Sequence, residues 1–281
     1  MNVEEPAATL SYVALSYMWP SEKGLEHVQL ERSNLHMLEQ PSGLDQIALP
    51  PVITDTMLLC KQLGENYLWV DRLCIIQDDT DSKHGQIRGM DRIYRSANLT
   101  IMAAINDRDT QGLPGLANRP RVPSIFMRLP LDRVEMMGGV TKSAKLSAAE
   151  ESVWNTRGWT FQERVLSTRR LYITEHQVLF ECPRGYDTEV DSSYSPRATT
   201  ESFKFRTTDP EWWFLHRDPV NYHITHDTSV EDYLAWVANY TSRQLSIGSD
   251  ILNAFAGISG MLDESQHACE YSKLELGKFP Q

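Results

Sequence analysis

The residue types best suited to catalysis lie in a tryptophan-rich segment, WNTRGWTFQE, which runs from Trp154 to Glu163. Trp159 and Glu163 are four positions apart, so on a helix they share one face and place a carboxyl group beside an aromatic ring. A carboxyl group against an apolar surface holds its proton more strongly, or stabilises a cation that develops in front of it. Both properties suit the cleavage of a glycosidic bond. Glu163 is therefore the candidate catalytic residue.

Two other interpretations of single residues stay open from the sequence alone. Thr160 and Glu163 fit the S/T-x-x-E capping box, in which the glutamate only closes the first turn of a helix. Cys74, with His84 ten residues later, invites comparison with a cysteine nucleophile and its base. A single thiol inside the apolar run Leu-Cys-Ile-Ile is more often a small buried side chain, and the sequence gives no sign that His84 lies near it.

Polar and aromatic side chains also gather where two predicted strands end. In a parallel α/β sheet, ligands bind at the carboxyl ends of the strands, because loops and helix N-termini converge there. Trp19 could supply a stacking surface, and Asp71 with Arg72 a polar clamp. Packing of Trp19 and capping of a turn by Asp71 are equally compatible with the pattern. The candidate residues at these strand ends are Ser16, Tyr17, Trp19, Asp71, Arg72, Cys74, Gln77 and Asp78.

Three short apolar runs, at residues 12–17, 67–76 and 99–105, predict the strands that position these side chains. The run at 67–76 is nearly continuous in apolar residues, which is typical of a strand covered on both faces, and we expect it at the centre of the sheet. Helical periodicity at 53–63, ended by Gly64, and at 87–97 fills the intervals. This alternation with short connections predicts an α/β fold with a mainly parallel sheet flanked by helices.

The rest of the chain predicts further elements around this core. Residues 106–150 are interpreted as a loop-rich insertion, with an edge strand near 124–131. A helix is expected from Gly158 to Leu166, a pair of strands at 170–174 and 177–182, and helices at 229–242 and from 249 onward. The predicted organisation is a domain at 1–182, an irregular linker at 183–228, a partly helical appendage at 229–262 and a disordered tail at 263–281.

Composition excludes several classes of function. The chain has 281 residues, 27 of them basic and 38 acidic, and its net charge of −11 opposes binding to nucleic acids and anionic membranes. No apolar run approaches the roughly 20 residues of a membrane span, and no secretory signal is recognised, so the cytoplasm is the expected location. Four widely separated cysteines favour reduced thiols over a zinc site or disulfides. Phosphate-loop and dinucleotide glycine motifs are absent.

Taken together, five segments resemble the heterokaryon incompatibility (HET) domain of fungi. They are YVALSYMW at 12–19, YLWVDRLCIIQD at 67–78, MDRIY at 90–94 with Ala97, GLPG at 112–115 and RGWTFQE at 157–163. The resemblance covers about residues 10–182, and YTSR at 240–243 with DILNAFAG at 250–257 resembles the segment that often follows the domain. It implies a role in non-self recognition between fungal cells, which ends in growth arrest or death of incompatible fusion cells.

HET domains are distantly similar to Toll/interleukin-1-receptor (TIR) domains, several of which hydrolyse NAD with one helix-borne glutamate. The TIR pattern W-C-x-x-E matches the spacing of Trp159 and Glu163, with Thr160 in place of the cysteine. The resemblance implies a flavodoxin-like sheet, no metal, and NAD as a substrate rather than a bound cofactor. Glu163 would then be the catalytic residue, and Arg157 and Trp159 would join Ser16 and the other strand-end residues in binding the substrate.

The alternative from a different functional class is a non-catalytic signalling module that acts by self-assembly and partner recruitment. The acidic surface and the aromatic-rich helices permit this, and Glu163 would then be only a helix cap. Under either interpretation the expected partners are a second copy of the chain or a protein of the incompatibility system. Nucleic acid is not an expected partner, and no segment is expected to span a membrane.

Overall fold

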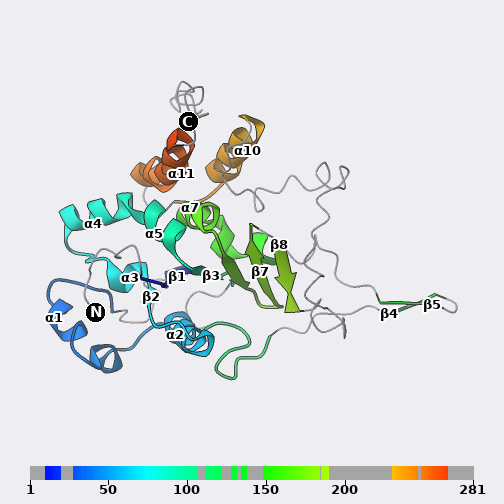
Figure 1. Ribbon diagram of the computed structural model, residues 1–281, viewed down its shortest axis with the longest axis horizontal. Helices are drawn as coiled ribbons and strands as arrows, with labels where there is room; N and C mark the ends of the chain where they lie inside the picture. Colours follow the sequence, from blue (N-terminus) through cyan, green and yellow to red (C-terminus); the bar gives the residue numbers. More distant parts are fainter. Residues whose placement is uncertain are drawn as a thin grey trace.

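A mixed six-stranded sheet lies at the centre of the computed structural model (Figure 1). The structure describes residues 10–19, 28–106, 112–121, 128–131, 134–137, 148–183, 185–189, 230–245 and 248–264. The strands stand in the order β2-β1-β3-β6-β7-β8. Their bounds are Leu68–Trp69 for β2, Val13–Ser16 for β1, Leu99–Ala103 for β3, Arg170–Ile173 for β6, Val178–Cys182 for β7 and Gly185–Thr188 for β8.

The direction of the strands confirms the predicted α/β class. β1 pairs in parallel with β2 on one side and with β3 on the other, and β3 pairs in parallel with β6. β7 and β8 then continue the sheet in antiparallel pairing. The chain thus moves from β1 to one neighbour and returns to the other, as it does in doubly wound sheets of the flavodoxin type. The carboxyl ends of β1 and β3 are the point where such sheets bind ligands.

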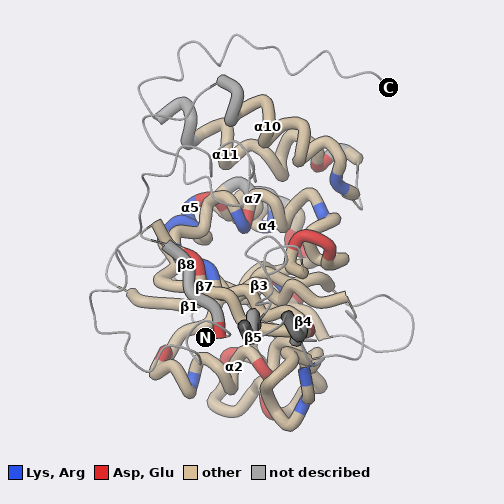
Figure 2. Tube along the Cα trace, turned by 90° about the vertical axis from the view of Figure 1, so that its right-hand side faces the viewer, with Lys and Arg blue, Asp and Glu red and all other residues tan. Residues whose placement is uncertain are grey.

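Helices cover both faces of the sheet (Figure 1 and Figure 2). Helix α2 lies on one face, α4, α5 and α7 lie on the other, and α10 with α11 pack outside α7 as a further layer. The longer helices are α2 Pro51–Leu63, α4 Thr80–Arg88, α5 Met90–Ser96, α7 Gly158–Leu166, α10 Val230–Thr241 and α11 Asn253–Glu264. The short ones are α1 Leu35–Leu38, α3 Asp71–Cys74, and the 3-10 turns η1 Gly43–Gln46, η2 Val153–Thr156 and η4 Gly248–Ile251.

Strand β1 is buried on both faces, and its alternating side chains supply two separate clusters of the core. Val13 and Leu15 pack with Ile53 of α2, whereas Ala14 packs with Phe161 of α7. Successive side chains of a strand point to opposite faces, so a central strand needs apolar residues at almost every position. The sequence prediction of a strand at 12–17 is confirmed, and so is that of a strand at 99–105, observed as β3.

The prediction for residues 67–76 is wrong in two respects. Only Leu68–Trp69 is a strand, and it lies at the edge of the sheet rather than at its centre. The chain then enters α3, because the carbonyl of Val70 accepts the amides of Leu73 and Cys74, at 3.0 and 2.8 Å. A continuous apolar run does not distinguish a long strand from a short strand followed by a buried helical turn.

Glycines divide the helices where the sequence predicts, and also at one position where it does not. Gly64 ends α2 in the left-handed conformation, with φ of 77°, as predicted. The single helix expected at 87–97 is instead two helices, α4 and α5, which are separated at Gly89. Helix α4 has a capped N-terminus, because the side chain of Asp79 accepts the amide of Ser82 at 3.3 Å.

The later elements match their predictions in part. Helix α7 and the antiparallel pair β6–β7 are confirmed, as are the helices α10 and α11. The strand expected near 124–131 is β4, Arg128–Leu131, which pairs with β5, Val134–Met137, in a separate two-stranded sheet and not at the edge of the main one. Strand β8 extends the main sheet into the linker predicted to be irregular. Residues 190–229 and the tail from 265 lie outside the described residues.

The GLPG motif at 112–115 is held against helix α2 by a buried carboxylate. Asp55 of α2 accepts the backbone amide of Leu113 at 2.7 Å and the Nε of Arg119 at 2.8 Å. Leu113 is completely buried in the cluster formed by β1 and α2. The side chain of Asp55 therefore holds this loop against the core.

We expect Asp55→Ala to lower the free energy of unfolding by about 2 kcal/mol, because it leaves the buried amide of Leu113 without an acceptor. Urea unfolding measures this change. Asp45→Ala is the matched control, because Asp45 is exposed in the short turn η1, and it should change stability by less than about 0.5 kcal/mol. Equal effects of the two substitutions on stability would show that Asp55 does not hold the loop against the core.

Candidate functional site

Glu163 lies between helix α7 and strand β1, buried against the sheet. Only 6% of its surface is exposed, and its Oε2 accepts a hydrogen bond from the hydroxyl of Ser16, the last residue of β1. The Ser16 hydroxyl in turn accepts the indole N–H of Trp154 at 2.9 Å. A buried chain of hydrogen bonds from Trp154 through Ser16 therefore fixes the carboxyl group of Glu163.

The surroundings of Glu163 favour its neutral form. Burial raises its pKa from 4.5 to about 8, the hydrogen bond from Ser16 opposes this rise, and the neighbouring carboxylate of Asp71 adds to it. Arg157 and the hydroxyl of Tyr94 act in the opposite direction and lower the pKa. Since the pKa lies above 7, Glu163 holds its proton at neutral pH. A nearby positive charge would stabilise the carboxylate and lower this pKa, so that the proton is released to water.

The capping-box interpretation of Glu163 is wrong. Helix α7 begins at Gly158, so Thr160 stands inside its first turn and not at the cap. The Thr160 hydroxyl donates instead to the carbonyls of Trp154 and Arg157, at 2.8 and 2.9 Å, and anchors α7 to the preceding turn. Glu163 is therefore free of the capping role and turns its carboxyl group to the sheet.

Trp19, Asp71 and Arg72 come together at the carboxyl ends of β1 and β2, as the strand-end argument predicts. Asp71 accepts the indole N–H of Trp19 and the backbone amide of Arg72, both at 2.7 Å. The guanidinium of Arg72 lies over the indole ring of Trp19, 4.7 Å from its centre. Burial raises the pKa of Asp71, and the bond from Trp19 opposes this. These bonds are the ones that the packing interpretation of Trp19 and Asp71 also expects.

Two polar groups at this site make no hydrogen bond of good geometry in the described part of the chain, although they lie close enough for one to lower the pKa of the other. They are the hydroxyl of Tyr17 and the Nη1 atom of Arg72, and their residues are 4% and 6% exposed. The positive charge of Arg157 also reaches this point, because it lowers the pKa of Tyr17, Asp71 and Glu163. Buried polar groups in folded proteins normally have a partner. The arrangement thus offers donors to a polar or anionic ligand beside a carboxyl group.

Three of the predicted binding residues are used elsewhere. Gln77 donates to the carbonyls of Asp71 and Ile75, at 3.1 and 3.0 Å, and so closes the turn after α3. Asp78 accepts the backbone amide of Arg32 at 2.9 Å. Trp159 lies one turn before Glu163 on α7, half-buried against the apolar cluster of α5, α7, α10 and α11. Of the three, only Gln77 contacts a residue of the site, through the carbonyl of Asp71.

The sequence interpretation missed Tyr94 and Trp154 as members of the site. Tyr94 projects from α5, is 1% exposed and donates to the carbonyl of Leu15 at 3.2 Å. Tyr94 stands inside the MDRIY motif of the family resemblance, and Trp154 begins the tryptophan-rich segment that ends at Glu163. Aromatic residues with a polar atom, repeated in such motifs, were the available signal.

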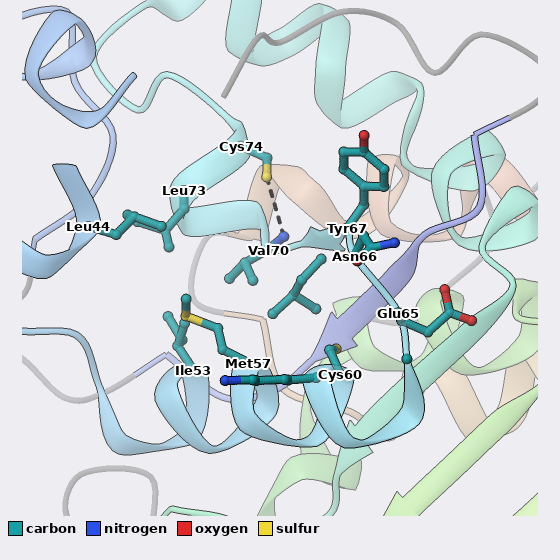
Figure 3. A pocket seen from close by; sticks show the side chains of 13 residues that line it. Leu44, Ile53, Met57, Cys60, Glu65, Asn66, Tyr67, Val70, Leu73 and Cys74 are labelled. Atoms are coloured by element: carbon teal, nitrogen blue, oxygen red, sulfur yellow. Dashed lines mark hydrogen bonds between the residues drawn. The ribbon is translucent and has the colours of Figure 1, made fainter. Parts of the chain in front are cut away.

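A separate cavity of about 310 Å³ lies between α2, β2 and α3 (Figure 3). Its walls are mostly apolar, and Cys60 of α2 and Cys74 of α3 line it from opposite sides. Burial raises the pKa of both thiols to about 11, and the sulfur of Cys74 accepts the amide of Val70 at 3.4 Å. A protonated thiol is a poor nucleophile, so Cys74 does not suit covalent catalysis. Cys60, Cys74 and Cys182 are free thiols, as predicted.

Among the described residues, no group of three or more His, Cys, Asp or Glu side chains is placed to hold a metal ion. Within the same ranges, every helix is too short or too polar to cross a membrane.

We expect Glu163→Gln to gain stability relative to the wild type as the pH rises. Between pH 4.5 and about 8 the unfolded chain releases the proton of Glu163 while the folded chain retains it, so the wild type alone loses stability through this group. Urea unfolding at pH 5, 6, 7 and 8 measures the difference. Glu151→Gln, at an exposed position, is the control and should show no such trend. Parallel curves for wild type and Glu163→Gln would show that the carboxyl group is well solvated.

The sequence also matches a known protein family. Residues 12–163 match the family model described as heterokaryon incompatibility protein (HET). Heterokaryon incompatibility protein 6, OR allele, of Neurospora crassa is 29% identical over an alignment of 102 positions, which covers 33% of this chain and 14% of that protein. The chain thus matches only a small part of the length of this relative. No solved structure matches significantly. Because the family model covers more than half of the sequence, the chain belongs to the heterokaryon incompatibility (HET) family.

Proposed function

We propose that this chain acts in fungal heterokaryon incompatibility and triggers cell death by hydrolysing the nicotinamide–ribose bond of NAD. Family membership and the name of the Neurospora relative support the first part. The observation that carries the second part is the buried carboxyl group of Glu163, fixed by Ser16 and with a pKa near neutrality. We place the activity in the cytoplasm, with NAD as a substrate and without a metal or bound cofactor.

The proposed reaction needs Glu163 in its ionised form when the substrate is bound. The nicotinamide ring of NAD carries a positive charge, so its binding would lower the pKa of Glu163 and release the proton. Breaking the bond expels neutral nicotinamide and leaves an oxocarbenium-like ribose, which the carboxylate stabilises. Water then attacks the ribose carbon and loses a proton, so that NAD and water yield ADP-ribose, nicotinamide and a proton.

The neighbouring groups suit the rest of the substrate. The unpartnered Nη1 of Arg72 and the charge of Arg157 would bind the phosphates, and the Tyr17 hydroxyl would bind a ribose or phosphate oxygen. Trp19 offers an aromatic surface, although Arg72 already covers one face of its ring. Ser16 acts on Glu163 and not on the substrate, because both of its hydrogen bonds are internal.

We expect Glu163→Gln to reduce nicotinamide release from NAD by about 100-fold or more, because the amide cannot supply the charge that stabilises the ribose cation. Concentrated protein is incubated with NAD, and nicotinamide is quantified by chromatography. Glu151→Gln, which removes an exposed carboxylate, should keep the wild-type rate. Equal release by wild type and Glu163→Gln, or none by either protein under conditions that favour assembly, would reject the enzymatic proposal.

The pH dependence gives a second test. The ratio kcat/KM reports the pKa values of the free protein, so it should increase with pH up to about 8 and then level off. The ratio increases with pH because the reaction needs Glu163 in its ionised form. A rate that falls over the same range would mean that Glu163 acts in its protonated form, as an acid.

One observation favours the alternative, a non-catalytic module that signals by self-assembly and partner recruitment. Glu163 is almost fully buried, and its carboxyl group already has a partner within the protein. In that case Glu163→Gln, which can still accept the bond from Ser16, would preserve cell death in fungal cells at equal expression. Under the enzymatic proposal the same substitution abolishes it.

A further inference from the structure

The turn that follows α10 is hydrogen-bonded to the N-terminal end of α7, the helix that carries Glu163. The backbone amide of Gln244 donates to the carbonyl of Thr156 at 2.7 Å, and the carbonyl of Gln244 accepts the amide of Gly158 at 2.8 Å. Arg157, which lies between these two residues, forms a parallel bridge with Gln244. The backbone on both sides of Arg157 is therefore fixed by residues more than 80 positions later in the chain.

The side chain of Arg243 adds a third attachment at the same place. Its Nη1 donates to the carbonyl of Arg157 at 3.3 Å, and its Nη2 donates to the side chain of Asn155 at 2.7 Å. Its guanidinium also lies 4.7 Å from the centre of the ring of Phe161 on α7. Arg243 thus contacts residues before, at and after the first turn of α7.

Helix α7 has no other cap at this end. Arg157 occupies the N-cap position, and its side chain makes no capping hydrogen bond. The first amides of a helix need acceptors from outside it, and Gln244 provides one of them. An added Cβ at Gly158 would lie 2.6 Å from the Cδ2 atom of Leu245, so the side chain of Leu245 would have to shift. The carbonyl of Gln244 therefore caps α7 here, as a side chain does in other helices.

Keeping Arg243 in this place has an electrostatic cost, which argues for a specific role. Burial and the neighbouring guanidinium of Arg164 lower the pKa of Arg243 to about 9, so it still carries a positive charge at neutral pH. Both arginines donate to the same oxygen of Asn155, at 2.7 and 3.0 Å. Two like charges on one acceptor repel each other, and the arrangement persists only because several contacts hold it.

We propose that Arg243 is a positioning residue, which sets the place of Arg157 and thereby the charge that acts on Asp71 and Glu163. The inference rests on the proposed function only for its effect on NAD hydrolysis, since the geometry itself does not depend on a substrate. Arg243 lies outside residues 12–163, which match the family model. The site would therefore be incomplete without the helical unit at 230–264.

The test compares Arg243→Ala and Arg243→Lys in the full chain with a matched control, Arg169→Ala. Arg169 also donates to a backbone carbonyl and to a side-chain amide, both of Asn98, at 3.2 and 2.7 Å, but it is exposed at the entrance to β6. The first measurement is the titration of the Glu163 carboxyl carbon by NMR. Arg157 lowers the pKa of Glu163, so its release should raise that pKa above the wild-type value.

We expect the rise in both Arg243 variants, larger for alanine, and none in Arg169→Ala. Lysine retains the charge but cannot reach Arg157, Asn155 and Asn239 together, so it should give a smaller shift of the same sign. If Arg243→Ala does not fold, the lysine variant decides. An unchanged Glu163 titration in a folded Arg243 variant would overturn the inference.

The second measurement is NAD hydrolysis, where we expect a decrease of about 10- to 100-fold for Arg243→Ala with little effect of the control. If the wild type does not hydrolyse NAD, the proposed function fails, and the NMR titration still decides the positioning role. If the wild type is active and Arg243→Ala keeps the full rate, the positioning role fails and the proposed function stands.

Discussion

A hydrogen bond between Ser16 and Glu163 joins the central strand β1 to helix α7, and the surrounding structure is organised around it. A buried carboxyl group is costly unless its hydrogen-bonding capacity is used, so the site needs a fixed donor at a fixed place. Strand β1 provides that place, because its other three residues are buried between α2 and α7. The indole of Trp154 fixes the donor in turn, since its N–H donates to the Ser16 oxygen.

A second buried polar network connects α7 to strands β6 and β7. Arg164 donates to the hydroxyl of Tyr172 on β6 at 3.2 Å, and this hydroxyl donates to Glu181 on β7 at 3.1 Å. Glu181 also pairs with Arg170 at 3.1 Å, and both side chains are at most 5% exposed. Arg164 also forms an ion pair with Glu150, at 3.6 Å from its Nη2 atom. A buried network favours the arrangement in which its members are paired. Helix α7 is thus fixed in register with β1, β6 and β7 together.

Local pattern predicted much of this architecture but few of its long-range contacts. The strands at 12–17 and 99–105 follow from apolar runs, and the site at the strand ends follows from general rules of parallel sheets. The run at 67–76 misled, because Val70 begins a helical turn that hydrophobicity alone does not reveal. Thr160 and Glu163 fitted a capping box by spacing, and only the observed start of α7 excludes it. The role of Arg243 could not be predicted from local pattern, because its partner Arg157 lies 86 positions away in the sequence.

The apolar side of α7 explains why the helices at 230–264 belong to the same structural unit as the sheet. Phe161 is 1% exposed because Tyr240 and Phe255 cover it, with ring centres 5.9 and 6.3 Å away. Burial of an aromatic side chain of this size contributes about 2 to 3 kcal/mol, and Trp236 of α10 is also completely buried. Without α10 and α11, the apolar side of α7 would be exposed to water. Its other side holds Glu163. The match to the family model ends at residue 163, within α7, but the hydrophobic core continues into α11.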